Sequence, residues 1–267
     1  MINRKITILG PEGTNLYILL QFMLFSVISW FTLFSSIESI EFETSNILSR
    51  QIAFSLIGLI VFFLTTYLSI DNLYNLINSL FFLSVSVLLG LLFTTPILGV
   101  RRWYDLEAVG LPIFIQPSEF SKIILVLFIA KMLSQNSYKL IALSGVLINL
   151  FLIFIQPDLG TTILLLIVTS LMFFVSDIKF RTAVLGLLVL FLSFFMLLEF
   201  NFLGDYQISR ITDFFSGEDF SQRQSRLSIS SGGLFGTYFT ESQITEVFVP
   251  VQTTDFIFSL FTRNFGF

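Results

Sequence analysis

The sequence has no cysteine and no histidine among its 267 residues. These two absences exclude disulfide bonds, cysteine nucleophiles, iron–sulfur ligation, histidine-based zinc sites and any Ser-His-Asp triad. Acid–base chemistry therefore has to come from carboxylates, lysines, arginines or hydroxyls. The metals that such side chains hold are hard cations.

Charge is also scarce. Charged residues make up 12% of the chain, against about 25% in ordinary globular proteins, and the mean hydropathy is +0.89. The missing charges leave long apolar runs, which are typical of a membrane protein with several spans. The net charge is −4 and no Lys/Arg-rich block is present, so we exclude nucleic acid as a partner.

Seven apolar windows approach the length of a membrane helix, which needs about 20 residues to cross the hydrocarbon. We expect an all-α, polytopic transmembrane helix bundle with seven full spans and the start of an eighth. The windows are 15–35, 51–70, 74–95, 113–134, 140–156, 160–176 and 182–203. Residues 204–254 are polar and predict one long loop. Residues 1–267 then form a single membrane domain.

Lysines and arginines in the short joints predict the orientation of the spans. With the N-terminus in the cytoplasm, the inside set is Arg4, Lys5, Lys131, Lys139, Lys179 and Arg181, and the outside set is Arg50, Arg101 and Arg102. This bias places the 204–254 loop on the outer side.

The apolar stretch 256–267 is too short to cross a bilayer, so we expect the sequence to be incomplete.

Glu119 and Lys122 stand inside an apolar window, where charge is costly and indicates function by default. In the run Gln116–Lys122 a proline opens a helix, Gln116 or Ser118 can cap it, and Glu119 and Lys122 share one face. A helix-start acid with a snorkelling lysine is one interpretation. We favour the other, a buried charged pair that lines a polar cavity.

Two outer joints carry further polar motifs. Arg101 and Arg102 precede Trp103, and the pattern suits either an interfacial anchor or a bidentate grip on an anionic lipid headgroup. These two interpretations stay open. For the next outer joint, Gln156–Thr162, we prefer a plain turn in which Asp158 caps the following helix.

Asp255 is the main candidate for acid–base chemistry. It stands directly before the apolar run 256–258, where partial desolvation would favour a general base, and an N-cap of the last helix is the competing interpretation. Gln224-Ser225 and Ser230–Gly233 precede it in the long loop. The two glycines allow close backbone approach and are more often a bend than a phosphate cradle.

These motifs together resemble the SEDS family (shape, elongation, division and sporulation), in its RodA-like group more than in its FtsW-like group. The resemblance rests on Gly99–Trp103, Ile115–Lys122, Gln156–Thr161, Gln224-Ser225 with Ser231–Gly236, and Thr254–Phe258, all in family order. It covers the chain from the first span to Phe267 and implies about ten spans in a complete protein.

The resemblance implies a peptidoglycan glycosyltransferase that polymerises lipid II on the outer face of the bacterial cytoplasmic membrane during cell elongation. A class B penicillin-binding protein would be its partner, and Asp255 its catalytic base. The resemblance assigns lipid II and its undecaprenyl carrier to Arg101, Arg102, Glu119, Lys122, Gln224 and Ser225. A divalent cation, Mg²⁺ or Mn²⁺, with Asp255 as a ligand, is a further expectation.

The sequence departs from the family pattern at Val251 and Thr253, where the family has Glu and His. Two alternatives to the enzyme therefore stay open. One is a non-catalytic or decayed scaffold for the penicillin-binding protein, which these replacements favour. The other, ranked well below, is a lipid II flippase, for which the sequence offers just one intramembrane charged pair.

Overall fold

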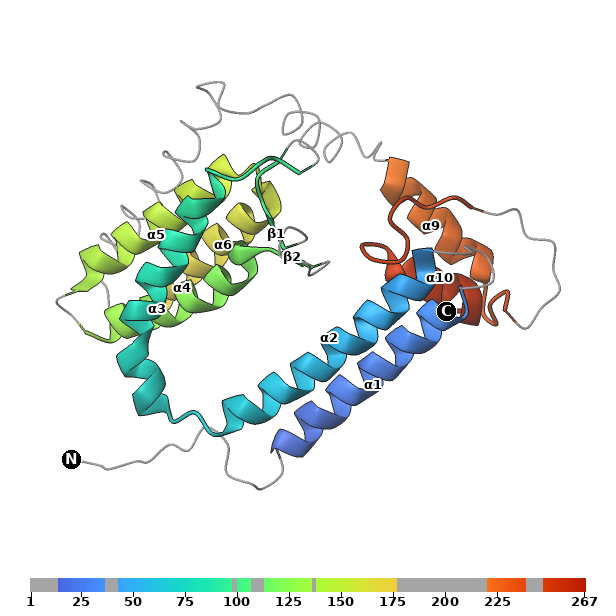
Figure 1. Ribbon diagram of the computed structural model, residues 1–267, viewed down its shortest axis with the longest axis horizontal. Coiled ribbons are helices and arrows are strands. Elements are labelled where there is room, and N and C mark those ends of the chain that lie inside the picture. The colour runs from blue at the N-terminus through green and yellow to red at the C-terminus, as the bar shows by residue number, and fades with distance from the viewer. Residues whose placement is uncertain are drawn as a thin grey trace. The chain divides into compact units, whose positions relative to one another are not determined.

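The computed structural model describes residues 14–36, 43–97, 100–106, 113–135, 138–176, 220–238 and 247–267 (Figure 1). The chain divides into two compact units, Met1–Ile70 with Thr212–Phe267, and Asp71–Ile211. Helices dominate both units, and each unit is described by itself.

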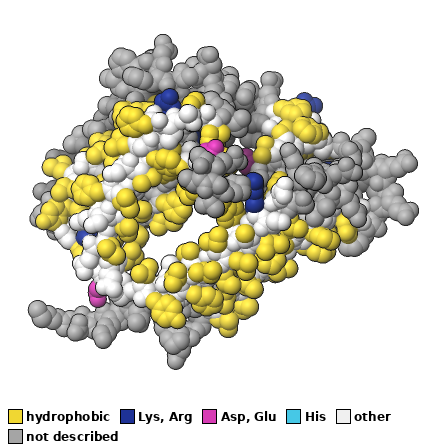
Figure 2. All heavy atoms as spheres, viewed as in Figure 1, with side chains coloured by type: hydrophobic (Ala, Val, Ile, Leu, Met, Phe, Trp, Pro, Cys, Tyr) yellow, Lys and Arg dark blue, Asp and Glu magenta, His cyan; other side chains and the backbone are white. Residues whose placement is uncertain are grey.

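Two long apolar helices, α1 (Thr14–Phe34) and α2 (Glu43–Thr66), pack side by side in the first unit. The indole Nε1 of Trp30 donates to Ser55 Oγ across their contact, at 3.3 Å. Most of their large apolar side chains are exposed, and Figure 2 shows hydrophobic side chains along this pair. Apolar surface that faces outward along a whole helix is what a hydrocarbon solvent requires.

The first unit also contains α9 (Phe220–Gly232) and α10 (Ile257–Phe265). The two helices run side by side in the same direction. Ser228 Oγ donates to the carbonyl of Ser259 at 3.3 Å, and further along both segments the Thr237 N–H donates to the carbonyl of Arg263 at 2.9 Å. The register of these two contacts decides which residues of α9 lie beside the start of α10.

Four helices and a small hairpin form the second unit. They are α3 (Ile70–Leu91), β1 (Tyr104–Asp105), β2 (Phe114–Ile115), α4 (Pro117–Ser134), α5 (Lys139–Ile155) and α6 (Leu159–Val175), and β1 pairs antiparallel with β2. The core is apolar, and the rings of Phe81 and Phe128 stack in it with centroids 3.9 Å apart. Gly145 on α5 makes room for them, because a Cβ there would lie 2.7 Å from Cε1 of Phe128.

Polar contacts in the interior tie α4 to its neighbours. Ser121, fully buried, donates to Oδ1 of the buried Asn149 on α5. Near the other end of α4, Lys131 is 9% exposed, donates to the carbonyl of Tyr74 on α3 and lies 4.4 Å from the centre of its ring. Each pairing offsets the desolvation of a buried polar group.

The prediction of a helical membrane fold is confirmed in its coarse form. Leu16–Phe34, Asn46–Thr66 and Ile70–Leu91 are long and apolar enough to cross a membrane. The fourth, fifth and sixth windows correspond to α4, α5 and α6. The window 182–203 lies outside the described residues.

The predicted boundaries of the second and third windows are wrong. Helix α2 begins at Glu43, so Arg50 lies inside a helix rather than in a joint, and α3 begins at Ile70, so Asp71 lies in its first turn. A hydropathy window detects only the apolar part of a helix. The backbone hydrogen bonds continue through polar turns as long as nothing interrupts them.

Candidate active site

Three of the sequence motifs meet where α4 and α6 begin, in the second unit. Gln116 Nε2 donates to Oδ2 of Asp158 at 3.2 Å. Arg102 donates through Nε to the carbonyl of Gln156 at 3.0 Å and through a terminal nitrogen to the carbonyl of Pro157. We call these five residues the motif node. It joins the hairpin segment to the first turns of two helices.

The motif node is also tied to α3 and to the cap of α6. Gln156 is 1% exposed and its amide donates to the carbonyl of Leu88 at 2.9 Å. Asp158 caps α6, since its Oδ1 accepts the N–H of Thr161 at 3.2 Å, which confirms the predicted turn. The predicted side-chain cap of α4 is wrong, because neither Gln116 nor Ser118 makes such a bond and the Gln116 amide is used by Asp158.

The two adjacent arginines have different environments. Arg102 is half-buried and holds backbone carbonyls of the motif node, whereas Arg101 is exposed and donates to the carbonyl of Leu92 at 3.1 Å. Just beyond them, the hydroxyl of Tyr104 donates to the carbonyl of Val87 at 2.8 Å, and burial raises the pKa of Tyr104. Arg101 is therefore the better placed arginine for an anion.

Glu119 and Lys122 form the predicted ion pair, with Lys122 Nζ 2.8 Å from Oε1 of Glu119. The pair is not buried as expected, since the Glu119 side chain is 55% exposed and that of Lys122 is 24% exposed. The helix period explains the difference. Ser118 and Ser121 lie on the inward, buried face of α4. Glu119 and Lys122 therefore lie on the other face.

An apolar cavity of about 360 Å³ adjoins this end of α4. It lies between α3, the hairpin and α4, and its lining residues are Leu80, Leu83, Ser84, Val87, Tyr104, Leu106, Ile115, Pro117, Phe120 and Ile124. Because Phe120 stands between Glu119 and Lys122 in the sequence, an apolar hollow and a charged pair share the first turns of α4. This combination suits a lipid with a charged head.

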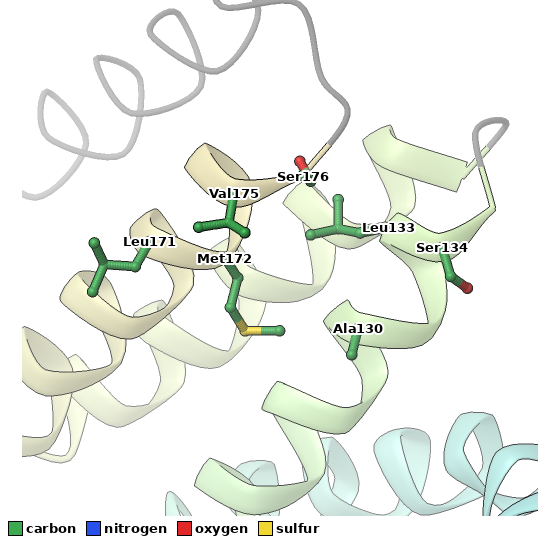
Figure 3. A pocket seen from close by; sticks show the side chains of 7 residues that line it. All are labelled: Ala130, Leu133, Ser134, Leu171, Met172, Val175 and Ser176. Atoms are coloured by element: carbon green, nitrogen blue, oxygen red, sulfur yellow. The ribbon is translucent and has the colours of Figure 1, made fainter. Parts of the chain in front are cut away.

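A second cavity, of about 550 Å³, lies at the opposite ends of α4 and α6 (Figure 3). Ala130, Leu133 and Ser134 line it from α4, and Leu171, Met172, Val175 and Ser176 line it from α6 and the residue after it. Both helices begin at the motif node and run about 25 Å to this cavity, at 1.5 Å per residue. The cavity therefore lies apart from the candidate site residues.

Asp255 lies in the first unit, in a turn over 250–256 that leads into α10. Its N–H donates to the carbonyl of Val251 at 3.1 Å, and the N–H of Thr254 donates to the same carbonyl at 3.2 Å. Val251 has φ of +53°, a left-handed conformation that a β-branched residue adopts at a cost of about 1–3 kcal/mol. Such strain is typical of functional turns, and here it aims one carbonyl at the Asp255 backbone.

The side chain of Asp255 is exposed, rather than partly desolvated as expected from its sequence neighbours. The competing interpretation, an N-cap of the last helix, is wrong. The N-cap residue of α10 is Phe256, and no side chain makes the cap bond. The carboxylate therefore stays available at the surface of its unit.

Gln224 and Ser225 lie one helical turn before Ser228, which contacts Ser259 of α10. Asp255 lies in the turn 250–256 that leads into α10, so the register of the two helices points Gln224 and Ser225 toward the end of α10 at which Asp255 stands. Both side chains are half-buried, and neither makes a hydrogen bond within the described residues. An amide and a hydroxyl can bind a sugar, and a carboxylate can accept a proton.

The described residues contain no cluster of metal-binding side chains. No three acidic side chains come together among them, and Asp255 is the one acid within 220–238 and 247–267. Mg²⁺ is usually held by one or two carboxylates together with water and substrate phosphates, so a Mg²⁺ ion bound by Asp255 stays a prediction.

A family model for the cell cycle proteins FtsW, RodA and SpoVE matches residues 14–267. The chain belongs to this family. It is the family named SEDS above, so the predicted resemblance is confirmed and the chain is a membrane protein. Its motifs at 115–122, 156–161 and 254–258 can be interpreted as SEDS motifs.

Individual proteins agree with this assignment. The chain is 34% identical over 258 residues to a probable peptidoglycan glycosyltransferase FtsW of Synechocystis sp., covering 88% of this chain and 62% of that protein. It is 31% identical over 240 residues to the peptidoglycan glycosyltransferase MrdB of Helicobacter pylori, covering 85% and 62%. The chain thus spans about six tenths of the length of these relatives.

A chain in the solved structure of a peptidoglycan synthase complex has the same fold. The TM-score is 0.64 at 24% identity, and the match covers 92% of this chain and 70% of that chain. The likeness supports the helical SEDS fold for the chain.

Replacing Arg102 by lysine is expected to destabilise this SEDS chain by about 1.5–3 kcal/mol, because an ammonium cannot hold two carbonyls with a fixed fork. Unfolding in an SDS titration measures the loss. Arg101→Lys is the matched control and is expected to change stability by less than about 0.5 kcal/mol, since Arg101 is exposed. An equal loss in both variants would contradict the clamp role of Arg102.

Proposed function

We propose that the chain is part of a peptidoglycan glycosyltransferase that polymerises lipid II into glycan strands during cell elongation. It would work as a multi-pass protein of the bacterial cytoplasmic membrane, with its site on the outer face. The observation that supports the proposal is the contact of Ser228 with Ser259, from which we infer that Gln224 and Ser225 lie toward the Asp255 end of α10. The relatives named peptidoglycan glycosyltransferase support it.

Asp255 would act as the general base. Its carboxylate takes the proton from the 4-hydroxyl of the acceptor sugar while that oxygen attacks the anomeric carbon of the donor. The bond between the anomeric carbon and the pyrophosphate oxygen breaks, and its electron pair leaves with undecaprenyl pyrophosphate. Gln224 and Ser225 would hold the acceptor sugar by hydrogen bonds, which fixes the attacking oxygen.

The second unit would hold the lipid. We assign the isoprenoid of the carrier to the cavity of about 360 Å³ beside the start of α4. Arg101 is exposed and Lys122 is paired with Glu119, and both would face the pyrophosphate as its charge grows. Arg102 would contribute by holding the motif node, rather than by touching the phosphate.

The proposed partner is a class B penicillin-binding protein, which would cross-link the strands that this chain makes. The structural relative belongs to a peptidoglycan synthase complex that coordinates polymerisation and crosslinking.

A scaffold without activity is the second candidate. Val251 and Thr253 favour it, since they supply no acid or base beside Asp255 where the SEDS pattern has Glu and His.

The test is glycan formation from purified lipid II in detergent, using the gene product that contains residues 1–267 together with its penicillin-binding partner. A ladder of glycan strands on a gel is the expected result. A flippase would give none, because detergent removes the two sides of the membrane. Partner binding without polymer would establish the scaffold instead, and co-purification measured in parallel separates it from a protein that has lost its fold.

A further inference from the structure

The outward face of α9 carries two arginines that the proposed activity does not use. Ser228 and Gly232 face α10, and at 100° per residue Arg223 and Arg226 fall on the far side of the helix. Both are exposed, and neither has a hydrogen bond or an ion pair within the described residues. An arginine is always charged, so these guanidiniums are free to bind an anion.

Apolar side chains accompany the two cations. On the same face of α9, Phe220 is 57% exposed and Leu227 is 46% exposed. In the turn that follows the helix, Leu234 is 74% exposed and Phe235 is 80% exposed. Guanidiniums beside exposed leucine and phenylalanine are typical of a helix that lies in the headgroup layer of a membrane.

The charges on α9 itself are both positive. Residues 220–238 and 247–267 contain three arginines, Arg223, Arg226 and Arg263, and one acid, Asp255. No carboxylate within these ranges lies on α9 itself. Glu218 and Asp219 directly precede the helix in the sequence, so the positive charge belongs to the face that Arg223 and Arg226 share.

The position of α9 within the first unit sets its level relative to the membrane. Asn264 Nδ2 donates to Ser35 Oγ at 2.9 Å, and the rings of Phe31 and Phe265 stack with centroids 5.2 Å apart. Phe31 and Ser35 lie at the end of α1, a candidate span over Leu16–Phe34. The end of α10 thus meets the end of a candidate span (Figure 1). The end of a span is where hydrocarbon gives way to headgroups.

The turn after α9 lies at this same level. The N–H of Tyr238 donates to the carbonyl of Asn264 at 2.9 Å, and the N–H of Phe267 donates to the carbonyl of Gly233 at 2.9 Å. Leu234 and Phe235 stand between these two contacts. Their exposed side chains are therefore held at the depth where the span ends.

We propose that α9 and the turn after it bind the surface of an anionic phospholipid membrane. Arg223 and Arg226 pair with lipid phosphates, and Leu234 and Phe235 insert among the first methylenes of the acyl chains. The surface would fix α9, which carries Gln224 and Ser225, at a set height above the bilayer. The lipid contact itself does not depend on the proposed glycosyltransferase activity.

The absence of cysteine allows a direct test, because Leu234→Cys creates a single site for a nitroxide label. The full chain is reconstituted in vesicles of phosphatidylcholine alone and in vesicles with about a third phosphatidylglycerol. Electron paramagnetic resonance, with oxygen and a water-soluble nickel complex as relaxants, gives the ratio of inserted to water-exposed label. We expect this ratio to rise about thirtyfold in the anionic vesicles, or about fivefold for each arginine.

Two double variants make the test specific. Arg223→Gln with Arg226→Gln is expected to return the ratio to its value in phosphatidylcholine. Arg223→Lys with Arg226→Lys keeps the charge and should keep the ratio, with a fall at high salt in both the parent and this variant. A label that stays in water in both kinds of vesicle, or a ratio that the glutamine pair leaves unchanged, would overturn the proposal. An unchanged SDS unfolding transition shows that the variants fold.

Discussion

Asp255→Asn is expected to lower the rate of glycan polymerisation by about 10²–10⁴-fold, which is the usual contribution of a positioned general base. Asparagine has the shape of aspartate but cannot take the proton from the attacking hydroxyl. The side chain of Asp255 is exposed and makes no hydrogen bond within the described residues. Stability should therefore change by less than about 0.5 kcal/mol, and the loss would be one of chemistry.

Glu119→Gln is the matched control for this substitution, since it also turns an exposed carboxylate into an amide. Its expected effect is a rise in KM for lipid II of less than about tenfold, because the exposed ion pair with Lys122 contributes at most about 1 kcal/mol. Initial rates from labelled lipid II separate kcat from KM in both variants. Polymerisation within tenfold of the parent in Asp255→Asn would move the base to another residue.

Local features of the site were predictable from the sequence. Pro117 opens α4, Asp158 caps α6, and Glu119 pairs with Lys122, each within four residues along the chain. Neighbouring residues and helix geometry alone decide such contacts. The same helix geometry explains why the pair is exposed, because Ser118 and Ser121 occupy the buried face of α4.

Contacts between distant segments could not be predicted in this way. Arg102 contacts Gln156 and Pro157, which lie 54 and 55 residues further along the chain. Two interpretations of the paired arginines stay open from the sequence, an interfacial anchor and a grip on an anionic headgroup. The packing of the hairpin segment beside α6 adds a third role for Arg102, which binds backbone carbonyls. The residues next to an arginine in the sequence do not show whether its guanidinium binds backbone carbonyls or a phosphate.

A signal for the packing of α9 on α10 was nevertheless present. Ser228, Gly232 and Gly236 recur at intervals of four, and small residues at this spacing let two helices approach closely. This spacing could have predicted that α9 packs tightly on another segment. It could not have named α10 as that segment, since the partner is chosen by tertiary contacts.

A large effect on stability is expected from Gly232→Ala. A Cβ at this position would meet the carbonyl oxygen of Thr262 and would lie 2.8 Å from Cα of Arg263. These are backbone atoms, so no rotamer change can relieve the overlap and α9 has to move away from α10. We expect a loss of about 3 kcal/mol in the free energy of unfolding, at the upper end of ordinary overpacking. Polymerisation should fall too, because Asp255 leads directly into α10.

Two other glycines separate this steric effect from the conformational freedom of glycine. Gly160 lies in α6 with nothing within 4 Å of an added Cβ, so Gly160→Ala should be neutral or stabilise by up to about 1 kcal/mol. Gly233 has φ of +56° and equally open surroundings, so Gly233→Ala should cost about 1–2 kcal/mol. SDS titrations of the three variants should therefore rank Gly232 first, Gly233 second and Gly160 last. If Gly232→Ala were no worse than Gly233→Ala, the register that brings Gln224 and Ser225 to Asp255 would lose its support.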